Sequence, residues 1–360
     1  MLRRARRACV GAIGARVGHT GTGPFVVALY AALALGGCVA QSQAEGPPVV
    51  QVNRITLDGG PADMAHLGAL EFEAGFALGA GDPRFGGLSG LWLSPDGGQL
   101  IAASDRGTLW RATLDHASDG RLIGVGDWQA VEPGRTPDDP AGRDAEALAP
   151  DGAGGLVIAY EGTHRLRRLA LDDLTAPAAV LPTPPALDRP SNTGMEALAD
   201  LPDGALLALA ERLFAASGDL AAWRIDGDRV LPLSYAAAQG YLPTGADRLD
   251  DTIFLVERRF SLVGGFATRI VSLPVAEVRS GARLVGRRLA ELRPPLLGEN
   301  FEAIAARRGP GGRVLLYLVS DDNFTALQRT LLLQLSLEAP GSASARGRER
   351  VGRAHQRPEG

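Results

Sequence analysis

The sequence predicts an all-β fold, a β-propeller of four-stranded blades. Three observations support this prediction. Short apolar runs separated by turn residues fill residues 51–338. A unit of roughly fifty residues recurs, and repeats of that length with four short strands are typical of propeller blades. A tight turn, often Pro-Asp-Gly, joins the first two strands of a unit, as an antiparallel hairpin requires.

Five repeats are visible, and their first strands are expected to line the axis of the ring. They begin at Leu88, Glu146, Glu196, Gly245 and Glu302, the fourth with a degenerate start. Strand-like runs near Val50–Leu57 and Leu67–Leu78 precede the first repeat and are expected to close the ring. A sixth blade would require this early stretch to supply more than closure.

The two ends of the chain read differently from the repeats. Residues 1–37 combine arginines with an apolar stretch, Phe25–Leu35, that is too short to span a bilayer. The stretch ends in Leu35-Gly36-Gly37-Cys38, which resembles a bacterial lipobox. We therefore expect an exported lipoprotein, lipidated at Cys38 and facing the periplasm or the cell surface, with residues 38–50 as a flexible tether. A plain secretory signal cut nearby is the alternative. Residues 339–360 are rich in arginine and poor in apolar residues, so we expect disorder there.

Composition excludes several functions. The chain contains no lysine, which rules out a P-loop lysine, a Schiff base and a Ser-Lys dyad from this chain. The formal net charge is −4, and residues 1–37 contribute five arginines and no acids. The remaining chain is thus more acidic, and we expect no binding of nucleic acid through a basic face. We expect a monomer that acts on a small anionic or ester substrate.

Carboxylates at equivalent positions of successive repeats are the main candidates for a functional site. Fifteen residues separate Glu146 from Glu161 and Glu196 from Glu211. Because each pair brackets a hairpin, its two acids should meet at the end away from the turn. If the blades are radial, the acids of all blades converge at one mouth of the channel. Oxygen ligands without cysteine or histidine favour Ca²⁺ or Mg²⁺ over zinc. The alternative for any single acid is a strand-end residue that accepts backbone hydrogen bonds.

Several segments of the chain resemble the phytase-like domain of bacterial secreted proteins, a family labelled esterase-like activity of phytase. The resemblance is carried by Ser104-Asp105-Arg106-Gly107, by Asn192-x-Gly194-x-Glu196, by Leu255–Arg258, and by Asn300–Ile304 with Ser320–Phe324. It covers nearly the whole mature domain. It implies a propeller that hydrolyses esters or phosphoesters with bound calcium. Alanine stands at 147, 197 and 303, where many members have glycine.

The candidate residues fall into three groups. Candidate metal ligands are the carboxylates of Asp105, Glu146, Glu161, Glu196, Glu302 and Asp321. Candidate catalytic groups are Glu211 or Glu257 to activate water, and Arg106, Arg212 or Arg258 to stabilise the developing charge. Candidate substrate-binding residues are Ser89, His164, Asn192, Asn300, Asp322 and Asn323. The leading hypothesis is a metal-dependent hydrolase of phosphoesters or carboxylic esters. A propeller lactonase and a non-catalytic, calcium-stabilised binding propeller remain open alternatives.

Overall fold

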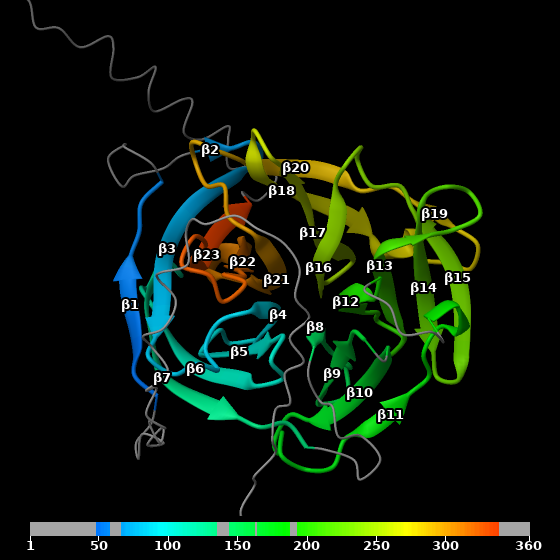
Figure 1. Cartoon of the computed structure of the whole chain (residues 1–360), viewed down its shortest axis with the longest axis horizontal. Coiled ribbons are helices and arrows are strands. Elements are labelled where there is room, and N and C mark those ends of the chain that lie inside the picture. The colour runs from blue at the N-terminus through cyan, green and yellow to red at the C-terminus, as the bar shows by residue number, and fades with distance from the viewer. Residues whose placement is uncertain (1–47, 58–65, 135–143, 163, 188–192, 338–360) are drawn as a thin grey trace, which may run out of the picture. The chain divides into compact units, whose positions relative to one another are not determined.

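The computed structural model describes residues 48–57, 66–134, 144–162, 164–187 and 193–337. These residues form five antiparallel sheets arranged as the blades of a propeller (Figure 1). The predicted all-β propeller is therefore confirmed, with five blades. The expectations for residues 1–37, the lipidation of Cys38, most of the tether and the arginine-rich tail lie outside the described residues and stay predictions.

Each blade runs outward from the axis in chain order. Blade 1 is β4 (Leu88–Leu93), β5 (Gln99–Ser104), β6 (Leu109–His116) and β7 (Leu122–Val131). Blade 2 is β8 (Ala145–Pro150), β9 (Gly155–Tyr160), β10 (Arg165–Ala170) and β11 (Ala179–Leu181). Blade 3 is β12 (Met195–Asp200), β13 (Leu206–Phe214), β14 (Leu220–Asp226) and β15 (Arg229–Tyr235), with the short β19 (Arg283–Leu284) parallel to β15. Blade 4 is β16 (Leu242–Leu249), β17 (Thr252–Ser261), β18 (Gly265–Pro274) and β20 (Arg287–Leu292).

The last blade combines both ends of the described chain. β21 (Phe301–Arg308), β22 (Val314–Ser320) and β23 (Thr330–Leu337) are its inner strands. β3 (Leu70–Ala80) pairs antiparallel with β23 and carries β1 (Val50–Arg54) and β2 (His66–Leu67) on its other side. The predicted closure by N-terminal strands is confirmed, and the early stretch forms no sixth blade. Three short 3₁₀ turns, η1 (Pro185–Leu187), η2 (Val275–Glu277) and η3 (Pro310–Gly312), complete the described elements.

The hydrophobic core is divided into five layers, each between two neighbouring blades. Alanine, valine and leucine alternate along the strands, so each blade has two apolar faces, and burial of both is the driving force for ring formation. The layer between blades 5 and 1 contains Phe85, Trp110 and Tyr317, and the layer between blades 3 and 4 contains Leu207, Ile253 and Val271. The blades are therefore held by their neighbours rather than by a shared centre. Within the described residues, no helix is long and apolar enough to cross a membrane.

Glycine lets the inner strands approach closely. A Cβ placed on Gly245 of β16 would lie 2.6 Å from the carbonyl oxygen of Glu302 and 2.8 Å from Cα of Ala303, both backbone atoms of the next blade. Residues such as Ala147, Ala303 and Gly90 also line this axis, where a space of about 10 Å³ remains, room for roughly one water molecule. The ring is thus closed along its axis below the mouth.

We expect Gly245→Ala to lower the free energy of unfolding by about 1–3 kcal/mol, because backbone must shift to admit the methyl group. Urea denaturation followed by tryptophan fluorescence would measure the loss. Gly79→Ala is the matched control, because a Cβ on Gly79 of β3 meets no atom within 4 Å. Equal stability of the two variants would contradict the close approach of blades 4 and 5.

Candidate functional site

A β-bulge recurs at the second or third residue of every inner strand. The registers of β4–β5, β8–β9, β12–β13, β16–β17 and β21–β22 each skip one residue there. The skipped residues are Ser89, Glu146, Glu196, Thr244 and Glu302. A bulge leaves its extra residue unpaired and re-aims its side chain. Five bulges at equivalent positions therefore present one side chain per blade at the same mouth of the ring, around the axis seen in Figure 1.

The two hydroxyl residues of this set join blades. Ser89 Oγ donates to the carbonyl oxygen of Ala145, and Thr244 Oγ1 donates to that of Phe301 at 3.2 Å. In both cases the acceptor is the residue just before the bulge of the next blade. Ser89, predicted to bind substrate, thus has its hydroxyl engaged between blades 1 and 2. Thr244 was missed because blade 4 has no acid at this place.

A second set of side chains lies where the second strands end. Each member follows directly after the residue that pairs with the one before the bulge, and the five are Asp105, Glu161, Glu211, Arg258 and Asp321. Backbone hydrogen bonds fix four of them, for example from the N–H of Glu161 to the carbonyl of Asp144 and from the N–H of Asp321 to that of Asn300. Glu146 with Glu161, Glu196 with Glu211 and Glu302 with Asp321 therefore meet at the predicted end of their hairpins. We call this mouth the acidic funnel, and define it by both sets.

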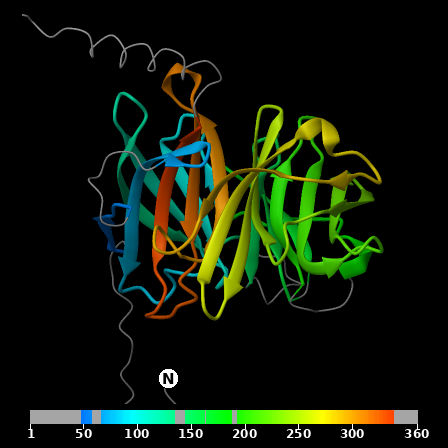
Figure 2. The ribbon, with the colours of Figure 1, turned by 90° about the horizontal axis from the view of Figure 1, so that it is seen from above.

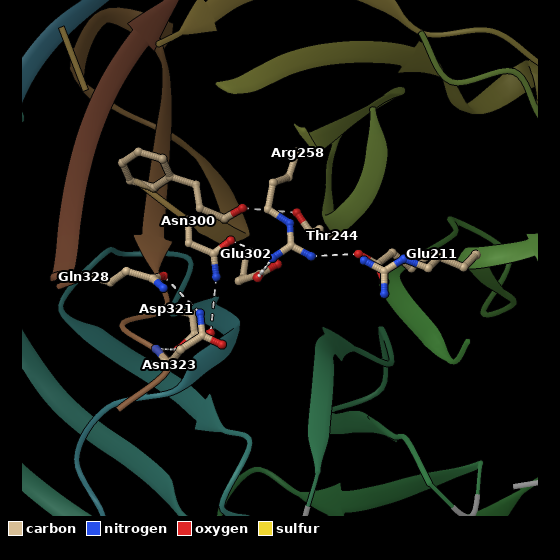
Figure 3. A network of polar contacts seen from close by, with 10 residues as sticks. Glu211, Thr244, Arg258, Asn300, Glu302, Asp321, Asn323 and Gln328 are labelled. Carbon is tan, nitrogen blue, oxygen red and sulfur yellow. Dashed lines mark hydrogen bonds and ion pairs between the residues drawn. The ribbon is translucent and has the colours of Figure 1, made fainter. Parts of the chain in front are cut away.

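Arg258 lies at the centre of the polar contacts in the funnel (Figure 3). One terminal nitrogen donates to Glu302 at 2.5 Å and to Oδ1 of Asn300 at 2.6 Å, and the other donates to Glu211 at 2.7 Å. Asn300 is fully buried, and its amide nitrogen donates a hydrogen bond to Oδ2 of Asp321 at 3.2 Å. One guanidinium group thus links blades 3, 4 and 5. Arg212 adds an ion pair with the other oxygen of Glu211 at 3.3 Å from the exposed side.

The carboxyl groups of the funnel outnumber these two arginines, and several of the carboxyl groups have raised pKa values. Burial raises the pKa of Glu302 to about 8, although Arg258 opposes the shift. Burial, and then the charge of Asp321, raise the pKa of Asp105 to about 7. Burial raises the pKa of Asp321 to about 6. Desolvation disfavours the charged form of each acid, and the neighbouring acids add repulsion.

Glu146 and Glu196 also have raised pKa values. Burial, followed by repulsion from the surrounding carboxylates, holds the pKa of each well above its usual range. Glu196 is only 8% exposed, yet it accepts no hydrogen bond from any residue that the structure describes. A buried carboxyl without donors favours either a proton or a cation.

One group of acids already has the spacing of metal ligands. Asp144, Glu146 and Glu161 each offer a carboxylate oxygen, and these atoms lie within 4.8 Å of one another. Asp144 was not among the predicted residues. It stands two residues before Glu146 with a positive φ of 74°, and this turn places it beside its neighbours. The pattern Asp-x-Glu at the start of the second repeat was the available signal.

Other predicted residues lie at the edge of the funnel or face away from it. Glu257, expected to act on water, precedes Arg258 on β17, where adjacent side chains leave on opposite faces. Its carboxylate accepts a hydrogen bond from Tyr235 at 2.6 Å. The register thus places Arg258, not Glu257, at the position of the acids in blade 4. Arg106 stacks on the ring of Phe324 at 3.3 Å and donates to the carbonyl of Pro83 at 2.5 Å.

The remaining predicted residues have local roles or fall outside the description. Asp322 accepts hydrogen bonds from the N–H of Gly87, the N–H of Phe324 and the hydroxyl of Thr330, so it ties blade 5 to blade 1. Asn323 donates its N–H to Asp321 and its side-chain amide to Gln328. His164 lies near Gly194, where a Cβ would approach its Nδ1 to 3.2 Å. Asn192 is outside the described residues.

Comparisons with known proteins agree with the family resemblance. Residues 83–324 match the Phytase-like family, described as esterase-like activity of phytase. No curated protein matches the chain. Among solved structures, an endo-arabinase from Bacteroides thetaiotaomicron VPI-5482 is 11% identical, with 72% of this chain and 96% of that chain covered and a TM-score of 0.43. A luciferin-regenerating enzyme is 14% identical, with coverages of 82% and 96% and a TM-score of 0.40. Puromycin hydrolase is 16% identical, with 64% of this chain and 33% of that chain covered and a TM-score of 0.29. Identities and scores at this level show neither activity nor substrate.

Proposed function

Because the chain belongs to the Phytase-like family, we propose that it is a metal-dependent hydrolase of phosphoesters or carboxylic esters that acts at the acidic funnel. The observation that carries this proposal is the set of buried carboxyl groups gathered from all but one blade, with raised pKa values and few cations. Such a site is stable when a proton or a cation compensates its charge. A substrate with negative charge would be repelled until that happens.

The donor set fits Ca²⁺. It consists of carboxylate oxygen atoms, and calcium takes six to eight oxygen ligands in flexible geometry. Asp144, Glu146, Glu161 and the unbonded Glu196 are the residues that would hold it. Bound there, calcium would neutralise the charge of a phosphate or polarise an ester carbonyl.

The side chains of the funnel have separable tasks in this proposal. Asp105 is suited to accept a proton from water, because its pKa is raised to about 7 and its buried Oδ1 has no hydrogen bond within the described part of the chain. Glu211 is engaged by Arg258 and Arg212, which suits it to hold Arg258 in place rather than to act on water. Arg212, exposed at the edge, is placed to contact an anionic substrate.

Stripping the protein of metal and restoring calcium tests the proposal. We expect Ca²⁺ to restore hydrolysis of p-nitrophenyl phosphate or p-nitrophenyl acetate, and Glu196→Gln to weaken calcium affinity at least tenfold because it removes one charged ligand. Isothermal titration calorimetry and a chromogenic assay would measure both. Glu277→Gln, at an exposed position of η2, is the matched control.

The same experiment separates the alternatives. Hydrolysis of a γ-lactone in preference to both esters would indicate a lactonase. Calcium binding that raises the melting temperature without turnover of any substrate would indicate a binding propeller and would end the hydrolase proposal. No calcium binding at millimolar concentration would remove the metal site as well.

A further inference from the structure

A second site lies outside the funnel, at the same end of blade 4. The turn between β17 and β18 and the segment after β20 enclose a pocket of about 450 Å³. Its lining includes Arg259, Gly265, Arg293, Pro294 and Leu296. Small-molecule sites commonly have volumes of about 300–1,000 Å³, so the pocket is large enough for a ligand of one or two rings.

Two arginines, Arg259 and Arg293, belong to the lining of the pocket. The side chain of Arg293 has neither an ion pair nor a hydrogen bond to the residues that the structure describes, and its carbonyl accepts the N–H of Leu296. Arg259 makes no ion pair with them either, and its guanidinium carbon stacks 4.8 Å from the ring centroid of Tyr241. Nearby arginines differ, since Arg269 and Arg288 both pair with Glu291. Since the protein as a whole is acidic, two arginines without acid partners in one pocket favour an anionic ligand.

Apart from Ser261, the rest of the lining is apolar or glycine. Ala267, Pro294, Pro295 and Leu296 contribute carbon surface, and no acidic side chain belongs to the lining. The β17–β18 hairpin, which lines part of the pocket, projects from the blade edge (Figure 2). It exposes Phe260, Leu262 and Val263, the last two almost completely. A ligand with an apolar stem would cover surface that is otherwise in water.

The pocket is linked to the funnel along the chain by two short stretches. Arg258 faces the funnel, and the next residue, Arg259, lines the pocket. The segment that begins at Arg293 in the pocket ends at Asn300, which accepts a hydrogen bond from Arg258. The pocket and the funnel therefore share strand β17 and the segment that follows β20.

We propose that this pocket binds an amphipathic anion, a carboxylate, sulfonate or phosphate carried on an aromatic or short acyl stem. Arg259 and Arg293 bind the charged group, and the proline-rich wall packs against the stem. Its use as the anchor for the non-reacting part of the substrate rests on the proposed hydrolase function. Binding of the anion in the pocket does not depend on that function, so an experiment can contradict the pocket proposal and the hydrolase proposal separately.

A fluorescent probe of this chemistry tests the pocket without turnover. The full-length protein in EDTA would be titrated with 8-anilinonaphthalene-1-sulfonate, and with the neutral N-phenyl-1-naphthylamine, which has the same rings. We expect one sulfonate probe per protein, and at least tenfold weaker binding in the Arg259→Gln/Arg293→Gln double variant. Arg279→Gln, another exposed arginine without an acid partner in the described structure, is expected to bind as the parent does.

Two results would overturn the proposal. One is unchanged affinity for the sulfonate in the double variant, and the other is equally tight binding of the neutral amine, which would indicate apolar adhesion alone. If loss of the Arg259–Tyr241 stacking unfolds the double variant, the single variant Arg293→Gln replaces it in the titration. We expect this variant to bind the sulfonate probe at least threefold more weakly than the parent. Probe binding in a protein that hydrolyses no ester would end only the hydrolase proposal.

Discussion

Replacing Arg258 with methionine is expected to lower the free energy of unfolding by about 3–5 kcal/mol at neutral pH. Its side chain is 18% exposed, and its partners Glu211 and Glu302 are 6% and 11% exposed. Without the guanidinium group, Glu211 loses the cation that faces it in this buried site, and Glu302 loses a hydrogen-bond donor. Urea denaturation of metal-free protein at pH 7 would measure the change.

Arg212→Met is the matched control for Arg258→Met. Arg212 contacts the same Glu211, but its side chain is 56% exposed. Exposed ion pairs contribute about 0–1 kcal/mol, because water screens them. Similar losses in the two variants would mean that burial does not strengthen the contacts of Arg258, and that the three blades are not joined through it.

Metal-free protein is expected to lose stability as the pH rises from about 6.5 to 8.5. Glu302 has its pKa raised by burial to about 8, above the value near 4.5 of an unfolded chain. Between these values the folded state binds more protons than the unfolded state, so the free energy of unfolding falls as pH rises. For Glu302 alone the loss over this interval is about 2 kcal/mol. Denaturation midpoints in EDTA at the two pH values would show it.

Glu302→Gln isolates this contribution. Asp105 and Asp247, whose pKa values burial raises to about 7, act in the same direction, so some pH dependence will remain in the variant. The difference between variant and parent belongs to Glu302. Calcium should flatten the profile of the parent, because the proposed function has it bind the ionised funnel. Stability that rises between pH 6.5 and 8.5 in EDTA would contradict the raised pKa.

The blade repeat and the glutamate pairs of blades 2 and 3 were predictable from the sequence, because the length of a hairpin is visible within one short segment. Glu146 with Glu161 and Glu196 with Glu211 recur at fifteen residues, and an unvarying hairpin length fixes both ends of each pair. Glu302 and Asp321 lie nineteen apart, because the turn containing η3 is longer. They were found through the family pattern and through the apolar run that follows Glu302.

Blade 4 shows what the sequence did not reveal. It has Thr244 and Arg258 where blades 2 and 3 have glutamates, so a search for matched acids selected Glu257, one residue away. A shift of one residue on a strand moves a side chain to the other face. The signal was Thr244-Gly245-Ala246, which matches Ser89-Gly90-Leu91 in residue size rather than in charge. The bulges themselves depend on pairing between strands, which no single segment specifies.

Blade 5 also determines when the protein can finish folding. Two of its paired strands, β3 and β23, are separated by the four other blades in the chain. A polypeptide that emerges from a ribosome or a translocation pore from its amino end must therefore keep β3 without its mate until residues 330–337 arrive. Until then β3 presents an open edge to other chains. Folding should be slow, and a fragment that lacks either end should stay an open arc that associates with itself rather than a smaller version of the native ring.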